Sequence, residues 1–162
     1  MKRLSILFSF TLIALLSVAQ AKYVFMFIGD GMGPNQILAA EMYQAALDGK
    51  IGRIPLLMTQ FPYSGQAATF SSSWGITDSA ASGTCLASGK KTKNGMIGQT
   101  PDGEAVYSVA TKLKEEGWGV GIMSSVPVDH ATPASQYAHA EKRYEYYKIG
   151  TQLASSDFDF FG

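Results

Sequence analysis

Cysteine is nearly absent from this chain of 162 residues, in which Cys85 is the single one. A lone cysteine excludes an internal disulfide and a zinc site made of several thiolates. Because no histidine lies near it in the sequence, we expect Cys85 to be a small buried thiol rather than a nucleophile. Histidine is also scarce. His130 and His139 are the only two, so a serine–histidine triad is possible but has no further support in the sequence.

An excess of charge of one sign is lacking as well, since 13 basic residues face 13 acidic ones. Two basic residues precede an uncharged, mostly apolar run at 4–18, and Ala-Gln-Ala at 19–21 has the small residues of a cleavage site. We therefore predict that residues 1–21 are a signal peptide, that the protein is exported to the periplasm or outside the cell, and that no membrane anchor remains after cleavage. Residues 22–162 then carry 11 basic and 13 acidic side chains, a balance that argues against a nucleic-acid partner.

Three common glycine-rich or serine sites are also missing. The turn at 29–34 has Pro34 where a dinucleotide-binding fingerprint requires its third glycine. The segment 84–90 resembles a phosphate-binding loop but has Thr84 in place of the first glycine. Ser79 lacks the two flanking glycines of a nucleophile elbow.

The pattern of apolar residues nevertheless predicts an α/β chain. Residues 23–28 are an unbroken apolar and aromatic run, typical of a strand buried on both faces. Similar runs at 119–126 and 158–161 predict two further strands. A parallel sheet that stops at its third strand leaves an edge strand whose backbone N–H and C=O groups are unpaired. We therefore interpret residues 22–162 as the first part of a larger α/β domain.

Four helices are expected between these strands. The first covers 34–47, beginning at a proline, and the second covers 79–88 with Asp78 as its N-cap. The third runs from about 101 to 116. A single fourth helix is expected to start at Pro133 and to carry Tyr137, His139, Arg143, Tyr146 and Tyr147.

Polar residues follow the predicted strands in places where open α/β sheets bind ligands. Asp30 ends the first strand, and His130 and Thr132 follow the second, with Arg143 one helix further on. Ser79 begins a helix, where backbone N–H groups and the helix dipole favour an anion.

Each of these residues also has a simpler explanation. Asp30 could stabilise the glycine turn, and Asp78 with Ser79 could only cap a helix. His130 could bond loop backbone, Arg143 could be a solvated helix charge, and His139 is expected to be a packing residue.

Three segments, taken together, resemble the alkaline phosphatases in order and spacing. They are FIGDGMG at 27–33, ITDSAASGT at 76–84 and DHATPASQYAHAEKR at 129–143. The resemblance implies a three-layer α/β/α fold, with residues 22–162 as the amino-terminal part of a single alkaline phosphatase domain. It also implies hydrolysis of phosphate monoesters through a phosphoserine, release of inorganic phosphate, cofactors of two zinc ions and one magnesium ion, and a possible homodimer.

The resemblance also implies a role for each candidate residue. Ser79 would be the nucleophile and a zinc ligand, and Arg143 would clamp phosphate oxygens. Asp30 would bind the second zinc and bridge to magnesium, Thr132 would bind magnesium, and His130 would act through water in the magnesium shell. The small residues after Ser79 would keep side-chain bulk away from the phosphate.

The resemblance further implies zinc and magnesium ligands that these 162 residues do not contain, so we expect the chain alone not to be an active enzyme. Two alternatives remain open at this stage. The chain could come from another hydrolase of the same superfamily, a phosphodiesterase or a sulfatase. It could also be a non-catalytic secreted fragment that binds phosphate at its anion site.

Overall fold

The computed structural model describes residues 22–162, so the signal peptide predicted for 1–21 lies outside the described residues. The chain divides into two compact units, Met1–Gly31 and Met32–Gly162, and each is described by itself. None of the helices within 22–162 is long and apolar enough to cross a membrane.

In the first unit, the strand predicted for 23–28 is not formed. These residues have no regular secondary structure, and Tyr23, Phe25 and Phe27 are 70%, 80% and 91% exposed. A strand exists only through hydrogen bonds to a neighbouring strand. In the described part of the chain no strand pairs with this segment. The prediction is therefore wrong for this structure, and the segment leads directly into a turn at Asp30 and Gly31, where Gly31 has a φ of +70°.

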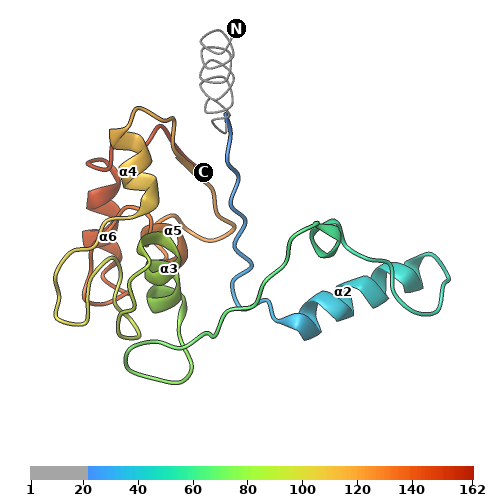
Figure 1. The fold of residues 1–162 in the computed structure, drawn as a ribbon. Helices are drawn as coiled ribbons and strands as arrows, with labels where there is room; N and C mark the ends of the chain where they lie inside the picture. The colour runs from blue at the N-terminus through green and yellow to red at the C-terminus, as the bar shows by residue number, and fades with distance from the viewer. Residues whose placement is uncertain (1–21) are drawn as a thin grey trace, which may run out of the picture. The chain divides into compact units, whose positions relative to one another are not determined.

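The second unit begins with helix α2, Pro34–Leu47, which starts at the predicted proline (Figure 1). A 3₁₀ helix, η1, follows at Leu57–Gln60.

A buried carboxylate joins α2 to the segment that leads into η1. Glu41 is only 1% exposed. Its oxygens accept hydrogen bonds from Thr59 Oγ1 at 2.7 Å, from Leu56 N at 3.1 Å and from Arg53 Nη1 at 3.1 Å. The Thr59 hydroxyl, then the Leu56 amide and Arg53, lower the pKa of Glu41 below its ordinary value.

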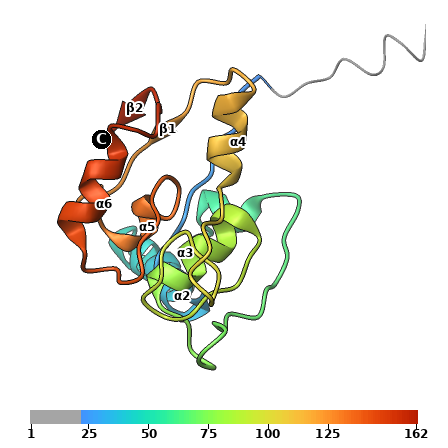
Figure 2. The ribbon, with the colours of Figure 1, turned by 90° about the vertical axis from the view of Figure 1, so that its left-hand side faces the viewer.

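The sheet of the described residues consists of two short parallel strands, β1 at Gly121–Ile122 and β2 at Phe160–Phe161 (Figure 2). Gly121 pairs with Phe160, so the second and third predicted strands form, although the second is shorter than expected. Helix α4, Val109–Glu115, also starts later than predicted, because Ser108 is its N-cap.

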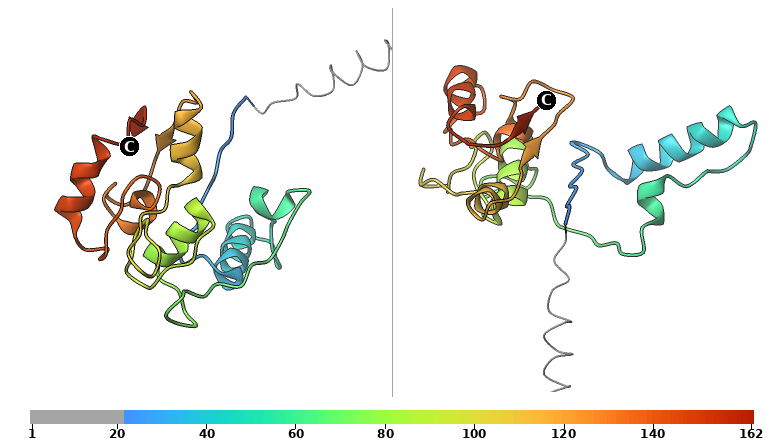
Figure 3. Two further views of the ribbon diagram at one scale, coloured as in Figure 1. Left: turned by 60° about the vertical axis from the view of Figure 1, so that its left-hand side comes forward. Right: turned by 90° about the horizontal axis from the view of Figure 1, so that it is seen from above.

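The single helix predicted after Pro133 is wrong. Helix α5, Ala131–Ala134, ends early, and helix α6, Tyr146–Leu153, is a separate element (Figure 3). Between them, Ala140 donates to Ile97 O and accepts from Ile97 N, both at 2.9 Å, in an antiparallel bridge. A residue that uses both backbone groups in a bridge cannot continue a helical ladder. Arg143 therefore lies in the turn between α5 and α6 rather than on a helix.

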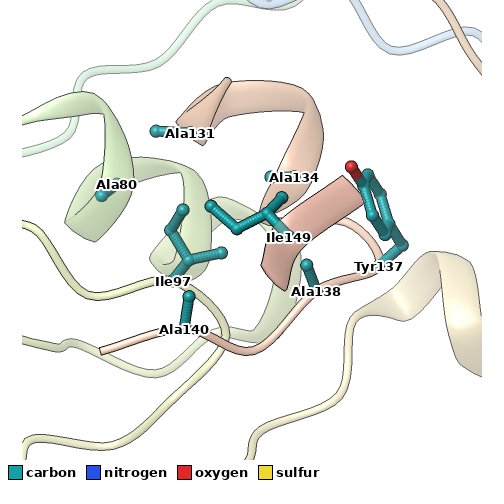
Figure 4. Close-up of a cluster of buried hydrophobic side chains, with 8 residues drawn as sticks. All are labelled: Ala80, Ile97, Ala131, Ala134, Tyr137, Ala138, Ala140 and Ile149. Atoms are coloured by element: carbon teal, nitrogen blue, oxygen red, sulfur yellow. The ribbon is translucent and has the colours of Figure 1, made fainter. Parts of the chain in front are cut away.

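The core of the second unit lies between α3 (Ser79–Ser88), α5 and α6 (Figure 4). Its members are mostly small, and they are Ala80, Ile97, Ala131, Ala134, Tyr137, Ala138, Ala140 and Ile149. Tyr137 is the one aromatic residue among them. Its ring packs edge-on against the ring of Phe161 in β2, with the ring centroids 5.2 Å apart. Its hydroxyl donates to Val128 O at 2.9 Å. Burial, with the nearby Asp129 charge as a lesser cause, raises the pKa of Tyr137 to about 12.

Replacement of the Glu41 carboxylate by an amide, Glu41→Gln, is expected to lower the midpoint of thermal unfolding at neutral pH, because the charged acceptor of three donors is lost. The folded-state pKa of Glu41 is depressed, so its contribution is complete above the unfolded pKa of about 4.3 and is lost as pH falls through the lower folded value. The stability difference between wild type and Glu41→Gln should therefore shrink below about pH 4. Calorimetry across pH measures this, with the exposed Glu115→Gln as control. An equal midpoint for wild type and Glu41→Gln at pH 7 would contradict the expectation.

Candidate functional site

The carboxylate of Asp78 organises the N-terminus of α3. Asp78 has extended backbone geometry, and its Oδ1 accepts a hydrogen bond from Ala81 N at 2.9 Å. This is the predicted N-cap, and Ser79 is the first residue of the ten-residue helix. The cap and the helix dipole together make this helix end a positively polarised environment around Ser79.

The second oxygen of the same carboxylate brings Arg143 to this helix end. Asp78 Oδ2 accepts from Arg143 Nη1 at 3.1 Å and from Gly95 N at 3.0 Å. The Arg143 and Asp78 side chains are 35% and 25% exposed, so the pair is half-buried. A guanidinium has five N–H donors in a fixed plane, so Arg143 can bind Asp78 and present further donors to an anion.

The small residues that follow Ser79 allow two helices to approach closely. Ala80, Ala81 and Thr84 of α3 are at most 2% exposed, and α3 contacts α5. A Cβ atom added at Gly83 would lie 2.7 Å from Ser135 Oγ and 3.1 Å from Ser135 Cβ, which is too close without a shift of Ser135. The small residue at Gly83 is therefore required for the packing of α3 against α5.

This packing places the element that carries His130 and Thr132 against the helix of Ser79. His130 is the N-cap residue of α5, and Thr132 is the second residue of the helix. The His130 ring stacks on the Tyr146 ring at the start of α6, with centroids 5.6 Å apart and planes 22° from parallel. His139, expected to be a packing residue, lies edge-on to Tyr107, and its Nδ1 donates to Gly98 O at 2.6 Å.

The predicted metal ligands are divided between the two units. Asp30 belongs to the first unit and Ser79, His130 and Thr132 belong to the second. Within residues 22–162, no group of three or more histidine, cysteine, aspartate or glutamate side chains lies close enough to hold a metal ion. Zinc takes three or four protein ligands, so the donor set present in this part of the chain does not by itself fit a zinc centre.

Sequence reasoning missed Asn94 and Gly95, which contact the segment before Ser79. Asn-Gly is a common turn dipeptide, so the sequence predicts only a loop at this point. The structure shows that Asn94 accepts from Asp78 N at 3.2 Å and donates to Ile76 O at 3.0 Å. The only sequence signal is that asparagine can both donate and accept, and this does not identify a partner 16 residues away.

The family model of the alkaline phosphatases matches residues 21–157 of this chain. The tissue-nonspecific isozyme of alkaline phosphatase from Gallus gallus is 35% identical over 141 residues, which are 80% of this chain and 27% of that protein. The same isozyme from Mus musculus is 34% identical over 134 residues, which are 76% of this chain and 26% of that protein. The chain thus spans about a quarter of the length of these relatives.

Solved structures give the same match. Alkaline phosphatase from the Antarctic bacterium TAB5 has a TM-score of 0.75 and 34% identity, covering 83% of this chain and 37% of that one. Alkaline phosphatase from Thermus thermophilus has a TM-score of 0.74 and 27% identity, covering 82% and 28%. A mutant of the TAB5 enzyme with Mg bound in its M3 site matches with a TM-score of 0.69 and 34% identity, covering 83% and 36%. These matches confirm the predicted α/β fold class. The chain corresponds to a part of the matched fold.

Truncation of the capping carboxylate, Asp78→Ala, is expected to lower the free energy of unfolding by about 1–2 kcal/mol, because α3 loses its N-cap and Arg143 loses its acceptor. Asp78→Asn keeps an acceptor for the helix and should cost less. Urea denaturation measures both, and Asp102→Ala, at an exposed loop position, is the control. A wild-type unfolding curve for Asp78→Ala would show that the cap does not stabilise α3.

Proposed function

This chain belongs to the alkaline phosphatase family, and we propose that it supplies the nucleophilic serine and the phosphate-binding arginine of a phosphate monoester hydrolase. The observation that carries the proposal is the ion pair between Arg143 and Asp78 at 3.1 Å. It joins an arginine to the residue directly before Ser79, at a helix N-terminus that favours anions.

Ser79 is proposed as the nucleophile. Ser79 is partly exposed at the first position of α3, so a substrate can approach it from solvent. Attack of Ser79 Oγ on phosphorus forms a phosphoserine as the bond to the leaving alcohol breaks, and the alcohol takes up a proton. Water then cleaves the phosphoserine to regenerate the serine and release inorganic phosphate. A serine hydroxyl is a weak nucleophile and requires activation for the first step.

Arg143 is proposed to bind the phosphate group. Its planar fork matches two phosphate oxygens, and the ion pair with Asp78 limits the directions in which the guanidinium can point. Fixing the direction in advance reduces the entropy lost when the substrate binds.

Zinc and magnesium are the proposed cofactors, with Asp30, Ser79 and Thr132 as direct ligands and His130 acting through water. When bound, such cations lower the pKa of a coordinated hydroxyl and neutralise phosphate charge. Thr132 and Asp30 supply hard oxygen donors of the kind magnesium prefers. Since residues 22–162 contain no complete ligand group, the proposal requires further ligands in the part of the family fold that this chain does not span.

A second candidate is a secreted phosphate-binding protein without catalysis, since the N-terminus of α3 can attract an anion without a metal ion. In that case Arg143 and the α3 N-terminus would bind phosphate and Ser79 would not be modified. Export is also proposed, from the sequence pattern at 1–21. A homodimer is proposed from the family alone.

The protein expressed from the intact gene is expected to hydrolyse p-nitrophenyl phosphate at alkaline pH. Ser79→Ala should abolish incorporation of radiolabelled phosphate after acid quenching, because the attacking oxygen is gone. Ser82→Ala is the matched control on the same helix, since the Ser82 hydroxyl only donates to Asp78 O at 2.8 Å. Equal labelling of Ser79→Ala and Ser82→Ala would refute the nucleophile. Phosphate binding without any labelling of the wild type would favour the binding protein.

Removal of the guanidinium, Arg143→Ala, is expected to weaken binding of inorganic phosphate by about 1.5–3 kcal/mol, the contribution of hydrogen bonds to a charged group. The affinity of Arg143→Lys for phosphate should lie between those of the wild type and Arg143→Ala, since lysine keeps the charge but has no planar guanidinium. Titration calorimetry with phosphate measures this, with the exposed neighbour Lys142→Ala as control. An affinity for phosphate that does not change in Arg143→Ala would rule out the clamp.

A further inference from the structure

Four hydrogen bonds join the loop at 93–95 to the segment that directly precedes Ser79. Asn94 N donates to Ser73 Oγ at 3.0 Å, and Asn94 Nδ2 donates to Ile76 O at 3.0 Å. Asp78 N donates to Asn94 Oδ1 at 3.2 Å, and Gly95 N donates to Asp78 Oδ2 at 3.0 Å. The contacted residues, 73–78, belong to no helix or strand, so these bonds replace the ladder that would otherwise order them.

The Asn94 amide is well suited to this task because one side chain satisfies a backbone acceptor and a backbone donor two residues apart. Aspartate at this position would place a carboxylate oxygen against Ile76 O, where two acceptors face each other. Alanine would leave both backbone groups without this partner.

The loop is itself held by the rest of the second unit. Thr92, which precedes it, is fully buried, and its carbonyl accepts from Ser72 N at 2.9 Å. After the loop, Thr84 of α3 donates to Met96 O at 3.4 Å and accepts from Gly98 N at 2.9 Å. A loop anchored to α3 on one side and to residue 72 on the other can transmit its position to the residues between them.

We propose that Asn94 is a positioning residue for the reaction at Ser79, acting through the backbone of Ile76 and Asp78 without touching the substrate. Asn94 fixes where α3 begins. Gly95 N fixes the position of Asp78 Oδ2, the oxygen that also accepts from Arg143. Loss of the amide would let Ser79 and Arg143 shift relative to each other. This inference rests on the proposed function, in which the two residues act on one phosphate.

The test compares Asn94→Asp with Asn35→Asp, the same chemical change at an exposed position of α2. In the protein from the intact gene, Asn94→Asp should slow phosphoserine formation at saturating substrate by about 10–100-fold, because a misplacement of about 1 Å can cost that much. The affinity for inorganic phosphate should change little, and Asn35→Asp should behave like wild type. In Asn94→Ala, the Asp78 amide should exchange with solvent faster than in wild type.

A wild-type rate of phosphoserine formation in folded Asn94→Asp would overturn the positioning role. So would an unchanged exchange rate of the Asp78 amide in Asn94→Ala. If Asn94→Asp does not fold, Asn94→Ser is judged by the same two measurements. Failure of the proposed function is distinguishable, because the wild type would then form no phosphoserine and Ser79→Ala would change nothing.

Discussion

The carboxylate of Asp78 is the interaction on which the arrangement of the second unit's polar residues depends. One oxygen caps α3 through Ala81 N, and the other accepts from Gly95 N and Arg143 Nη1. These are charge-assisted hydrogen bonds in a half-buried setting, so they are stronger and more directional than neutral ones. A single side chain thus ties together a helix start, a loop and a turn that are up to 65 residues apart in sequence. Because Ser79 is its neighbour, the same contacts decide where the serine lies.

The close contact between α3 and α5 is the second constraint. It is possible because Gly83 has no Cβ atom to meet Ser135, and it brings the element with His130 and Thr132 against the helix of Ser79. The core around this contact is built mainly from alanine, which buries little apolar area per residue. Polar contacts therefore contribute a large part of the structural specificity here, and Tyr137 and Glu41 are further examples.

Much of the local structure could be predicted from the sequence. Helix α2, helix α3 with its N-cap at Asp78, and the strand at 160–161 follow from proline placement, capping chemistry and apolar runs. Two wrong predictions share one cause. The strand at 23–28 needed a partner strand, and the helix after Pro133 was interrupted by the bridge between Ile97 and Ala140. Both depend on hydrogen bonds to distant residues, which a periodic pattern does not contain.

The sequence by itself determined the residue types and spacing that assign the chain to its family, and it placed Ser79 at the start of a helix. Those properties are local, since capping preference and side-chain chemistry act over a few neighbouring residues. Only the tertiary structure decided that Arg143 binds Asp78, that Asn94 holds the backbone before Ser79, and that Gly83 lies against Ser135. Each of these contacts joins groups 16 or more residues apart, and such pairs form only when the whole chain folds and brings their donors and acceptors within reach.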